Sequence, residues 1–100
     1  MFAVKLTVDF KDWLGRLRDS KAKLAIIKRL QRLELGNHGD AKALGEGLSE
    51  MRIDVGPGYR VYYVRRGEIL FVVLWGGDKS SQDRDIAKAR DIVTMLEDEE

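Results

Sequence analysis

The chain has 100 residues, of which 44% are hydrophobic, and it contains one proline, one histidine and no cysteine. This composition predicts a single domain over residues 1–100 and excludes a disulfide framework, a thiolate zinc site and a multi-histidine centre, so we expect no metal and no cofactor. The net charge is only +1, and the longest apolar run, residues 69–75, is too short to cross a bilayer, which predicts a soluble cytoplasmic protein without a membrane partner.

A strand and two helices are expected in the first third of the chain. Apolar and polar residues alternate over residues 2–6, which is typical of a strand. Asp9 is suited to cap a helix over residues 10–17, and a second helical pattern over residues 20–33 ends before Gly36. We expect these two helices to pair as an antiparallel hairpin.

The second half of the chain is expected to form three strands and one more helix. Their patterns fall at residues 48–55, 59–65, 68–75 and 82–96. Gly56, Pro57 and Gly58 predict a tight turn between the first two of these strands. Residues 97–100 are expected to form a frayed acidic tail.

The order of elements is therefore β-αα-βββ-α, which predicts an α+β fold. The N-terminal helical hairpin should pack on one face of a small antiparallel sheet, and a C-terminal helix should follow the last strand. We expect the functional site on the opposite face, since the helices can cover only one face of the sheet.

Three cationic side chains are candidates for a site on that open face. Arg52 and Arg60 fall on neighbouring strands, where facing side chains lie about 5 Å apart, and Lys79 follows the last strand. Guanidinium groups bind phosphate bidentately and stabilise charge in its transfer, so their convergence would favour a phosphodiester. The alternative is that Arg52 forms an ordinary surface ion pair with Glu50 or Asp54.

Two further features have both a functional and a structural interpretation. The glycine-rich segment 76–82 precedes the last helix, where a phosphate could rest against backbone groups, or where Ser80 or Ser81 could simply cap the helix. His38 is a candidate general base because histidine titrates near neutral pH; alternatively, it is a residue of a glycine-flanked surface loop.

Charged and aromatic residues indicate an anionic partner. Residues 11–32 contain eight basic and two acidic residues, whereas residues 78–100 contain four basic and eight acidic ones. This polarity favours either an anion-binding surface or two solvated helices of opposite charge. The candidate RNA contacts are basic helical residues and tyrosines that could stack on bases, namely Lys21, Lys28, Arg32, Tyr59 and Tyr62. At least one of the tyrosines is instead expected to pack in the sheet.

Four ordered motifs carry a resemblance to a known family. They are residues 36–40 (GNHGD), 50–53 (EMRI), 56–62 (GPGYRVY) and 76–82 (GGDKSSQ). Together with the helical pattern that precedes them, these motifs resemble the RelE/ParE superfamily of toxins, specifically its addiction-module killer proteins, a HigB-like branch. The resemblance covers nearly the whole chain.

The resemblance implies the toxin of a type II toxin–antitoxin system that inhibits translation. Many relatives cleave mRNA in the ribosomal A site, with the 2′-hydroxyl of the RNA as nucleophile and without a metal. The implied partners are a cognate helix-turn-helix antitoxin, the ribosome with its mRNA, and operator DNA reached only through the antitoxin. Arg60 matches the arginine of the family's strand motif, and Arg52 and Lys79 lie at motif positions, so all three are expected to be catalytic.

The chain departs from the family pattern at its proton-transfer groups. RelE enzymes have lysines on the second strand, near Met51 and Ile53 here, and they or related nucleases have a tyrosine or histidine near the C-terminus. No tyrosine or histidine follows Tyr63 in this chain. The general base is therefore open, and its candidates are Asp78, Asp83, His38 and Tyr62. Two alternative functions are a ParE-like inhibitor of DNA gyrase without nuclease activity, and a degenerate toxin that acts only in antitoxin binding and operon autoregulation.

Overall fold

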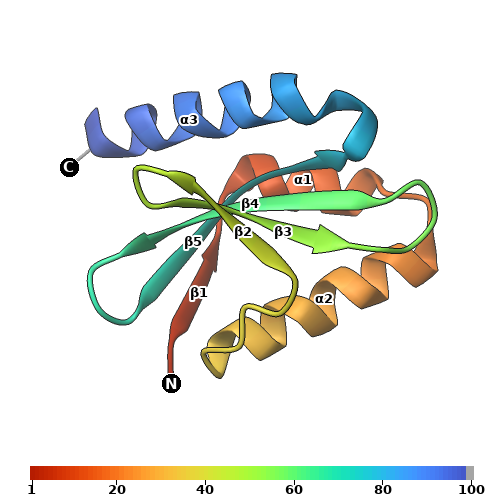
Figure 1. Ribbon diagram of the computed structural model, residues 1–100, viewed down its shortest axis with the longest axis horizontal. Helices are drawn as coiled ribbons and strands as arrows, with labels where there is room; N and C mark the ends of the chain where they lie inside the picture. Colours follow the sequence, from red (N-terminus) through yellow and green to blue (C-terminus); the bar gives the residue numbers. More distant parts are fainter. Residues whose placement is uncertain (99–100) are drawn as a thin grey trace.

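A five-stranded mixed sheet and three helices form an α+β structure, as the sequence predicts (Figure 1). The structure is a computed structural model that describes residues 1–98. In chain order, its elements are β1 (Ala3–Leu6), α1 (Val8–Arg16), α2 (Ser20–Glu34), β2 (Ala41–Gly45), β3 (Leu48–Ile53), β4 (Tyr59–Arg66), β5 (Leu70–Asp78), the 3-10 turn η1 (Lys79–Ser81) and α3 (Gln82–Asp98).

The strands lie in the order β1-β5-β4-β3-β2, and β1 runs parallel to β5 while the other neighbours are antiparallel. The expectation of an all-antiparallel sheet is therefore wrong at β1. Alternation over residues 2–6 indicates a strand but carries no information on its direction or its partner. Parallel pairing needs a long connection between the two strands, and here the chain from α1 to β4 supplies it.

The edge strand β2 is absent from the sequence prediction. It pairs with β3 through a tight connection in which Glu46 and Gly47 have φ angles of 57° and 81°. The sequence of β2, AKALG, lacks the β-branched and aromatic residues that mark a strand, and most of its side chains are exposed. The strand begins immediately after Asp40.

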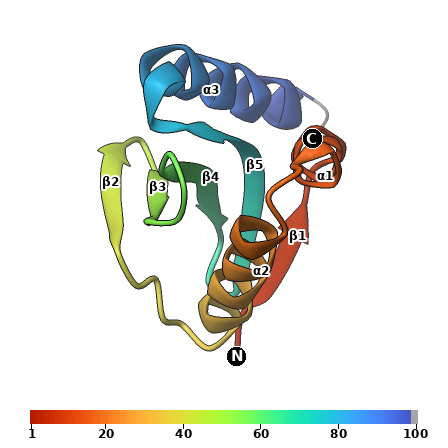
Figure 2. The same cartoon turned by 90° about the vertical axis from the view of Figure 1, so that its right-hand side faces the viewer.

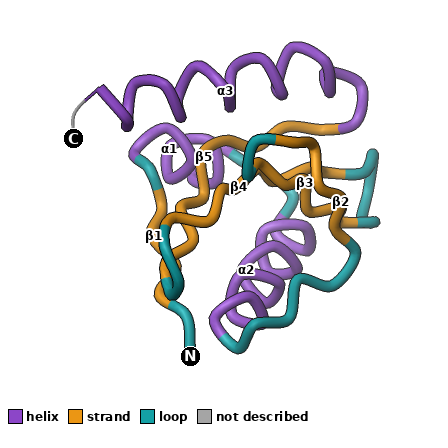
Figure 3. The backbone as a smooth tube through the Cα atoms, turned by 60° about the vertical axis from the view of Figure 1, so that its left-hand side comes forward, coloured by secondary structure: helices purple, strands orange, loops and turns teal. Residues whose placement is uncertain are grey.

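Helices cover both faces of the sheet, and the expectation that they cover one face is wrong. Figures 2 and 3 show α3 on one side of the strands and α2 on the other. The core is divided accordingly, because Val61 and Tyr63 of β4 pack with α1 and α2, whereas Tyr62 and Val64 pack with α3. Successive side chains of a strand point to opposite faces, so a strand that is apolar at every position requires two covering layers.

The first two helices begin at capping residues. Thr7 Oγ1 accepts a hydrogen bond from Phe10 N (3.0 Å), so Thr7 caps α1 in place of the expected Asp9. Asp19 Oδ1 accepts a hydrogen bond from Ala22 N (3.1 Å) at the start of α2. The main contacts of α1 are with β5, and those of α2 are with β1 and β3. Each of these two helices therefore packs mainly against the sheet and less against the other helix.

The last helix, α3, continues to Asp98, beyond its expected end at Leu96. The tail expected over residues 97–100 is therefore helical as far as Asp98, and Glu99 and Glu100 lie outside the described residues. No helix in the described part of the chain is long and apolar enough to cross a membrane.

Candidate functional site

Arg52 and Arg60 are directly opposite each other on β3 and β4. Their register depends on the turn between the strands, where Gly56 and Gly58 have φ angles of 59° and 86° that favour glycine. Gly58 N donates a hydrogen bond to Val55 O (3.0 Å) and closes this turn. The turn thus brings the two arginines together, as their spacing in the sequence predicts.

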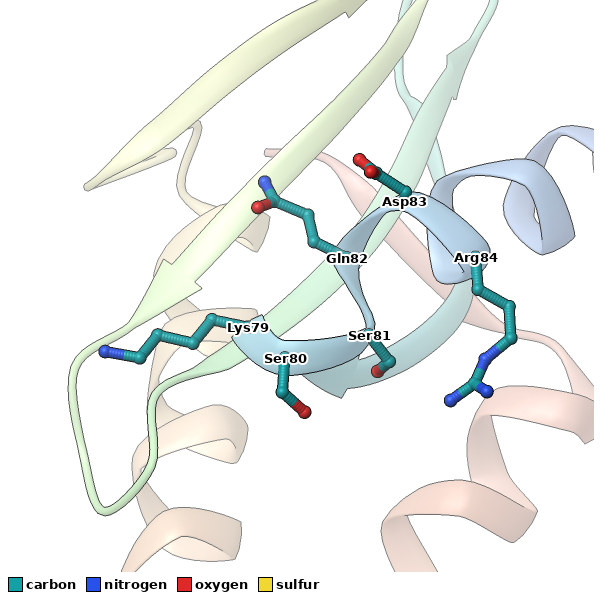
Figure 4. A pocket seen from close by; sticks show the side chains of 6 residues that line it. All are labelled: Lys79, Ser80, Ser81, Gln82, Asp83 and Arg84. Atoms are coloured by element: carbon teal, nitrogen blue, oxygen red, sulfur yellow. The ribbon is translucent and has the colours of Figure 1, made fainter.

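Lys79 reaches the same place from the start of η1. Its backbone N donates a hydrogen bond to Gly58 O (3.0 Å). A Cβ added to Gly58 would lie 3.3 Å from Lys79 Cδ and 3.8 Å from Arg60 Nη1, so glycine leaves the room that both side chains use. Figure 4 shows Lys79 extending toward the loop that joins β3 and β4, while Arg84 points away from that loop.

The three cations line one shallow depression of about 170 Å³, which we call the hairpin depression. Its lining residues are Asp40, Arg52, Asp54, Gly56, Pro57, Gly58, Arg60 and Lys79. Arg52 and Arg60 alternate in phase with Leu48 and Tyr62, which pack against α3, so both arginines belong to the α3 face of the sheet. The depression therefore lies where that face extends past the start of α3.

Glu50 lies beside the two arginines and is completely buried. Its Oε1 lies 3.3 Å from Arg52 Nε and 3.5 Å from Arg60 Nε. Its Oε2 accepts a hydrogen bond from Gln82 Nε2 (2.6 Å) at the start of α3. Arg52 thus forms the ion pair with Glu50 that the sequence analysis gives as the alternative to a phosphate site. This is not an ordinary surface ion pair, because the Glu50 carboxylate is buried and also faces Arg60.

Comparison with known proteins relates the chain to an uncharacterized protein of Haemophilus influenzae. The two sequences are 46% identical over 87 residues, which make up 87% of this chain and 88% of that protein. The chain belongs to the same family as this protein. No protein-family model matches the chain.

Tyr59 and Tyr62 are buried, so the prediction that their rings stack on RNA bases is wrong. Their exposed fractions are 8% and 0%. Tyr59 packs edge-on against Trp13, with ring centroids 6.2 Å apart, and Tyr62 packs beneath α3. Burial, with the Glu50 carboxylate nearby, raises the pKa of Tyr62, so this phenol is not a general base at neutral pH.

The basic residues predicted to contact RNA form a separate surface on α2. Lys21, Lys28 and Arg32 are all exposed, and their helical spacing places them on one stripe. None of the three lines the hairpin depression. Because α2 and α3 cover opposite faces of the sheet (Figure 2), any contact of this stripe with RNA is distinct from a contact made by the arginines.

The other predicted proton-transfer groups lie outside the depression. His38 Nδ1 is 2.7 Å from Tyr63 Oη, on the other side of β4 from the arginines. Asp78, rather than either serine after it, caps η1 by accepting a hydrogen bond from Ser80 N (2.8 Å). Hydrogen bonds from Ser80 lower the pKa of the Asp78 carboxyl, which makes it a weaker base. Neither these side chains nor Asp83 line the hairpin depression.

The glycines of segment 76–82 make room for neighbouring side chains. Gly76 and Gly77 belong to β5 and not to a loop. A Cβ on Gly76 would collide with the ring of Trp13, and a Cβ on Gly77 would collide with the carboxylate of Asp85. The expectation that these glycines let the backbone approach a phosphate is therefore wrong, because protein atoms already occupy the space beside them.

Two carboxylates of the depression, Asp40 and Asp54, are absent from the predicted catalytic set. Strand β2 leads away from Asp40, whose carbonyl oxygen accepts a hydrogen bond from Arg52 N (2.9 Å). Arg29 of α2 holds both backbones, since its Nη1 donates to Arg52 O (2.6 Å) and its Nη2 donates to Asp40 O (3.0 Å). The only local sequence feature that points to either carboxylate is the GNHGD motif, which ends at Asp40.

The hairpin depression combines groups for anion binding with groups for proton transfer. Its guanidinium and ammonium groups can bind a phosphodiester, and its carboxylates can accept a proton from a nearby hydroxyl. Within residues 1–98, no group of three or more histidine, cysteine, aspartate or glutamate side chains is arranged to hold a metal ion.

Proposed function

We propose that the protein is the toxin of a type II toxin–antitoxin system, with a RelE-like fold, that inhibits translation by cleaving mRNA on the ribosome. The observation that carries this proposal is the convergence of Arg52, Arg60 and Lys79 in one depression. All three lie at motif positions of the family that the sequence resembles. Glu50 offsets part of the repulsion between the two arginines from behind, and a phosphate group can bind the outward nitrogens of all three cations.

The proposed reaction uses the RNA as its own nucleophile. The 2′-oxygen attacks the adjacent phosphorus and the bond to the 5′-oxygen breaks, which yields a 2′,3′-cyclic phosphate and a 5′-hydroxyl. Arg52 and Arg60 stabilise the negative charge on the non-bridging oxygens. Asp40 or Asp54, the carboxylates that line the depression, accepts the proton of the 2′-hydroxyl. The leaving 5′-oxygen takes a proton from water, and the protonated carboxyl then returns its own proton to the solvent.

The proposal assigns three partners in the cytoplasm. The ribosome presents the mRNA and holds it in the geometry needed for attack, so the toxin itself needs only a small contact with the scissile phosphate. A cognate helix-turn-helix antitoxin neutralises the toxin by covering it. Operator DNA is reached only through that antitoxin.

Brief induction of the protein in a bacterial host tests the proposal. We expect growth to stop with truncated transcripts, and we expect Arg60→Ala to restore growth although the variant remains folded. Arg84→Ala is the matched control and should stay toxic, because Arg84, near the start of α3, points away from the β3–β4 loop (Figure 4). Growth arrest with intact mRNA would contradict the nuclease proposal.

A second candidate function is ParE-like inhibition of DNA gyrase without RNA chemistry. One observation favours it: within the described chain, no histidine or tyrosine lines the hairpin depression. Its sign in the induction experiment is DNA damage and stalled replication while messages stay intact. Harmless expression of folded protein would instead indicate a degenerate toxin that acts only in antitoxin binding and operon autoregulation.

A further inference from the structure

Glu50 is an internal carboxylate that simple packing does not explain. Among residues 1–98, only Glu50 and Asp85 are both charged and buried, with exposed fractions of 0% and 6%. Removing a carboxylate from water is costly unless cations and hydrogen-bond donors surround it, and an apolar residue of similar volume often stabilises such a place as well or better. Stability alone therefore does not explain why a charged residue occupies position 50.

We infer that Glu50 is a positioning residue that holds Arg52 and Arg60 in the orientation in which they bind the scissile phosphate. This inference rests on the nuclease function proposed above. One oxygen, Oε1, faces the Nε atoms of both arginines at 3.3 and 3.5 Å. A single carboxylate oxygen thereby sets the separation of two guanidinium groups that would otherwise repel each other.

The contacts of Glu50 leave the outer edges of the guanidinium groups available. Within residues 1–98, no hydrogen bond engages the terminal nitrogens of Arg52, and one engages those of Arg60, from Nη1 to Tyr59 O (3.1 Å). Arg60 Nε is buried and has no hydrogen-bond partner, so the attraction of Glu50 restrains it without a well-directed bond. The terminal nitrogens can therefore contact a phosphate while the carboxylate restrains the other side of each group.

Gln82 links this arrangement to α3. Its Nε2 donates to Glu50 Oε2 (2.6 Å), which leaves Oε1 to face the arginines. Gln82 is the first residue of α3, and it follows directly after η1, which carries Lys79. The same short segment thus places Lys79 in the depression and orients the carboxylate behind Arg52 and Arg60.

Glu50 is not itself placed to accept the proton of the substrate hydroxyl. It has no exposed surface, and both of its oxygens already face donors from Arg52, Arg60 or Gln82. A substrate hydroxyl would have to displace one of these groups to reach it. Its effect on the reaction therefore passes through the arginines.

A double-mutant cycle tests this role with purified protein and ribosomes programmed with a defined mRNA. Glu50→Gln keeps the size of the side chain and removes its charge, and we expect it to lower the single-turnover cleavage rate at saturating toxin by about 100-fold, the scale of a misplacement of roughly 1 Å. In an Arg60→Ala background, the same substitution should lower the residual rate only a few-fold, because one arginine remains to be oriented.

Asp85→Asn provides the matched control. Asp85 is the other buried carboxylate, and it accepts hydrogen bonds from Trp75 Nε1 (3.0 Å) and Ser81 Oγ (2.5 Å) without contacting an arginine. The factor by which Asp85→Asn lowers the cleavage rate, including any loss of folded protein, should be the same in the wild-type and the Arg60→Ala backgrounds. If Glu50→Gln does not fold, Gln82→Ala takes its place in the cycle, since it removes the donor that orients Glu50.

The possible outcomes separate the two proposals. Equal effects of Glu50→Gln, or of Gln82→Ala in its place, in both backgrounds would overturn the positioning role and leave the nuclease function intact. An Arg60→Ala protein that cleaves mRNA at the wild-type rate would overturn the proposed site itself. A strong effect of the substitution in the wild-type background and a weak one in the Arg60→Ala background would support both.

Discussion

The two faces of the β3–β4 hairpin differ although the same strands form both. On the α1 and α2 side, Met51, Ile53 and Tyr59 continue the apolar core to the ends of the strands. On the α3 side, the apolar residues of β4 begin at Tyr62, and charged side chains occupy the hairpin end. The helix α3 starts at Gln82, beside this end, and covers β4 and β5 from there onward. A site is thus left open where one helical layer begins.

The largest effect is expected on the open face, and it should appear in activity and not in folding. Arg60→Ala should lower the cleavage rate by roughly several hundred-fold, the range found when one donor to a developing negative charge is removed. The free energy of unfolding should fall by only about 1 kcal/mol, because Arg52 and Gln82 still hold Glu50. Urea unfolding and ribosome-dependent cleavage measure the two quantities on one sample, and a loss of folding that accounts for the lost activity would remove the distinction between the faces.

A substitution on the closed face, the side of the sheet that α1 and α2 cover, should affect folding and not activity. Ile26 of α2 is fully buried among the residues that cover this side of the sheet. Ile26→Ala should lower the free energy of unfolding by about 3 kcal/mol, as is usual when a cavity is left in a core. Cleavage per folded molecule should stay at the wild-type level, measured well below the unfolding temperature of the variant. A specific loss of activity in the folded variant would show that the closed face also shapes the site.

A smaller, pH-dependent effect is expected where β5 passes into η1. Hydrogen bonds from Ser80 lower the pKa of Asp78 below its ordinary value of 3.8 in the folded protein. The carboxylate therefore stabilises the fold above that value, and its contribution disappears as the pH falls through the folded-state pKa. Asp78→Ala should cost about 0.5 kcal/mol at pH 7 and progressively less below pH 4. Thermal unfolding over this pH range measures the difference, and a constant difference would contradict the assigned cap.

The arginine pair could be predicted from sequence because its geometry is local. A Gly-Pro-Gly turn joins the two strands, and a hairpin of fixed turn length has a fixed register. Arg52 and Arg60 are therefore placed opposite each other by the residues between them. The α+β class follows from the change in periodicity along the chain for the same reason.

The remaining features depend on contacts between distant segments. Strand-rich composition marks Tyr59 and Tyr62 as strand residues, but it does not reveal that α3 covers the second face and buries Tyr62. The buried carboxylate of Glu50 accepts a hydrogen bond from Gln82, which lies 32 residues further along the chain. The strand β2 has no strand-forming composition and is held by its pairing with β3, so no local pattern announces it.

The chemistry of the RNA ends tests the central claim most directly. After brief induction, fragments of translated messages should carry 2′,3′-cyclic phosphate and 5′-hydroxyl ends, and they should be missing in cells that express Arg60→Ala. Their presence with Arg84→Ala would show that the loss is specific to the hairpin depression. Intact messages during growth arrest, or fragments with 5′-phosphate ends, would contradict cleavage by 2′-hydroxyl attack at this site.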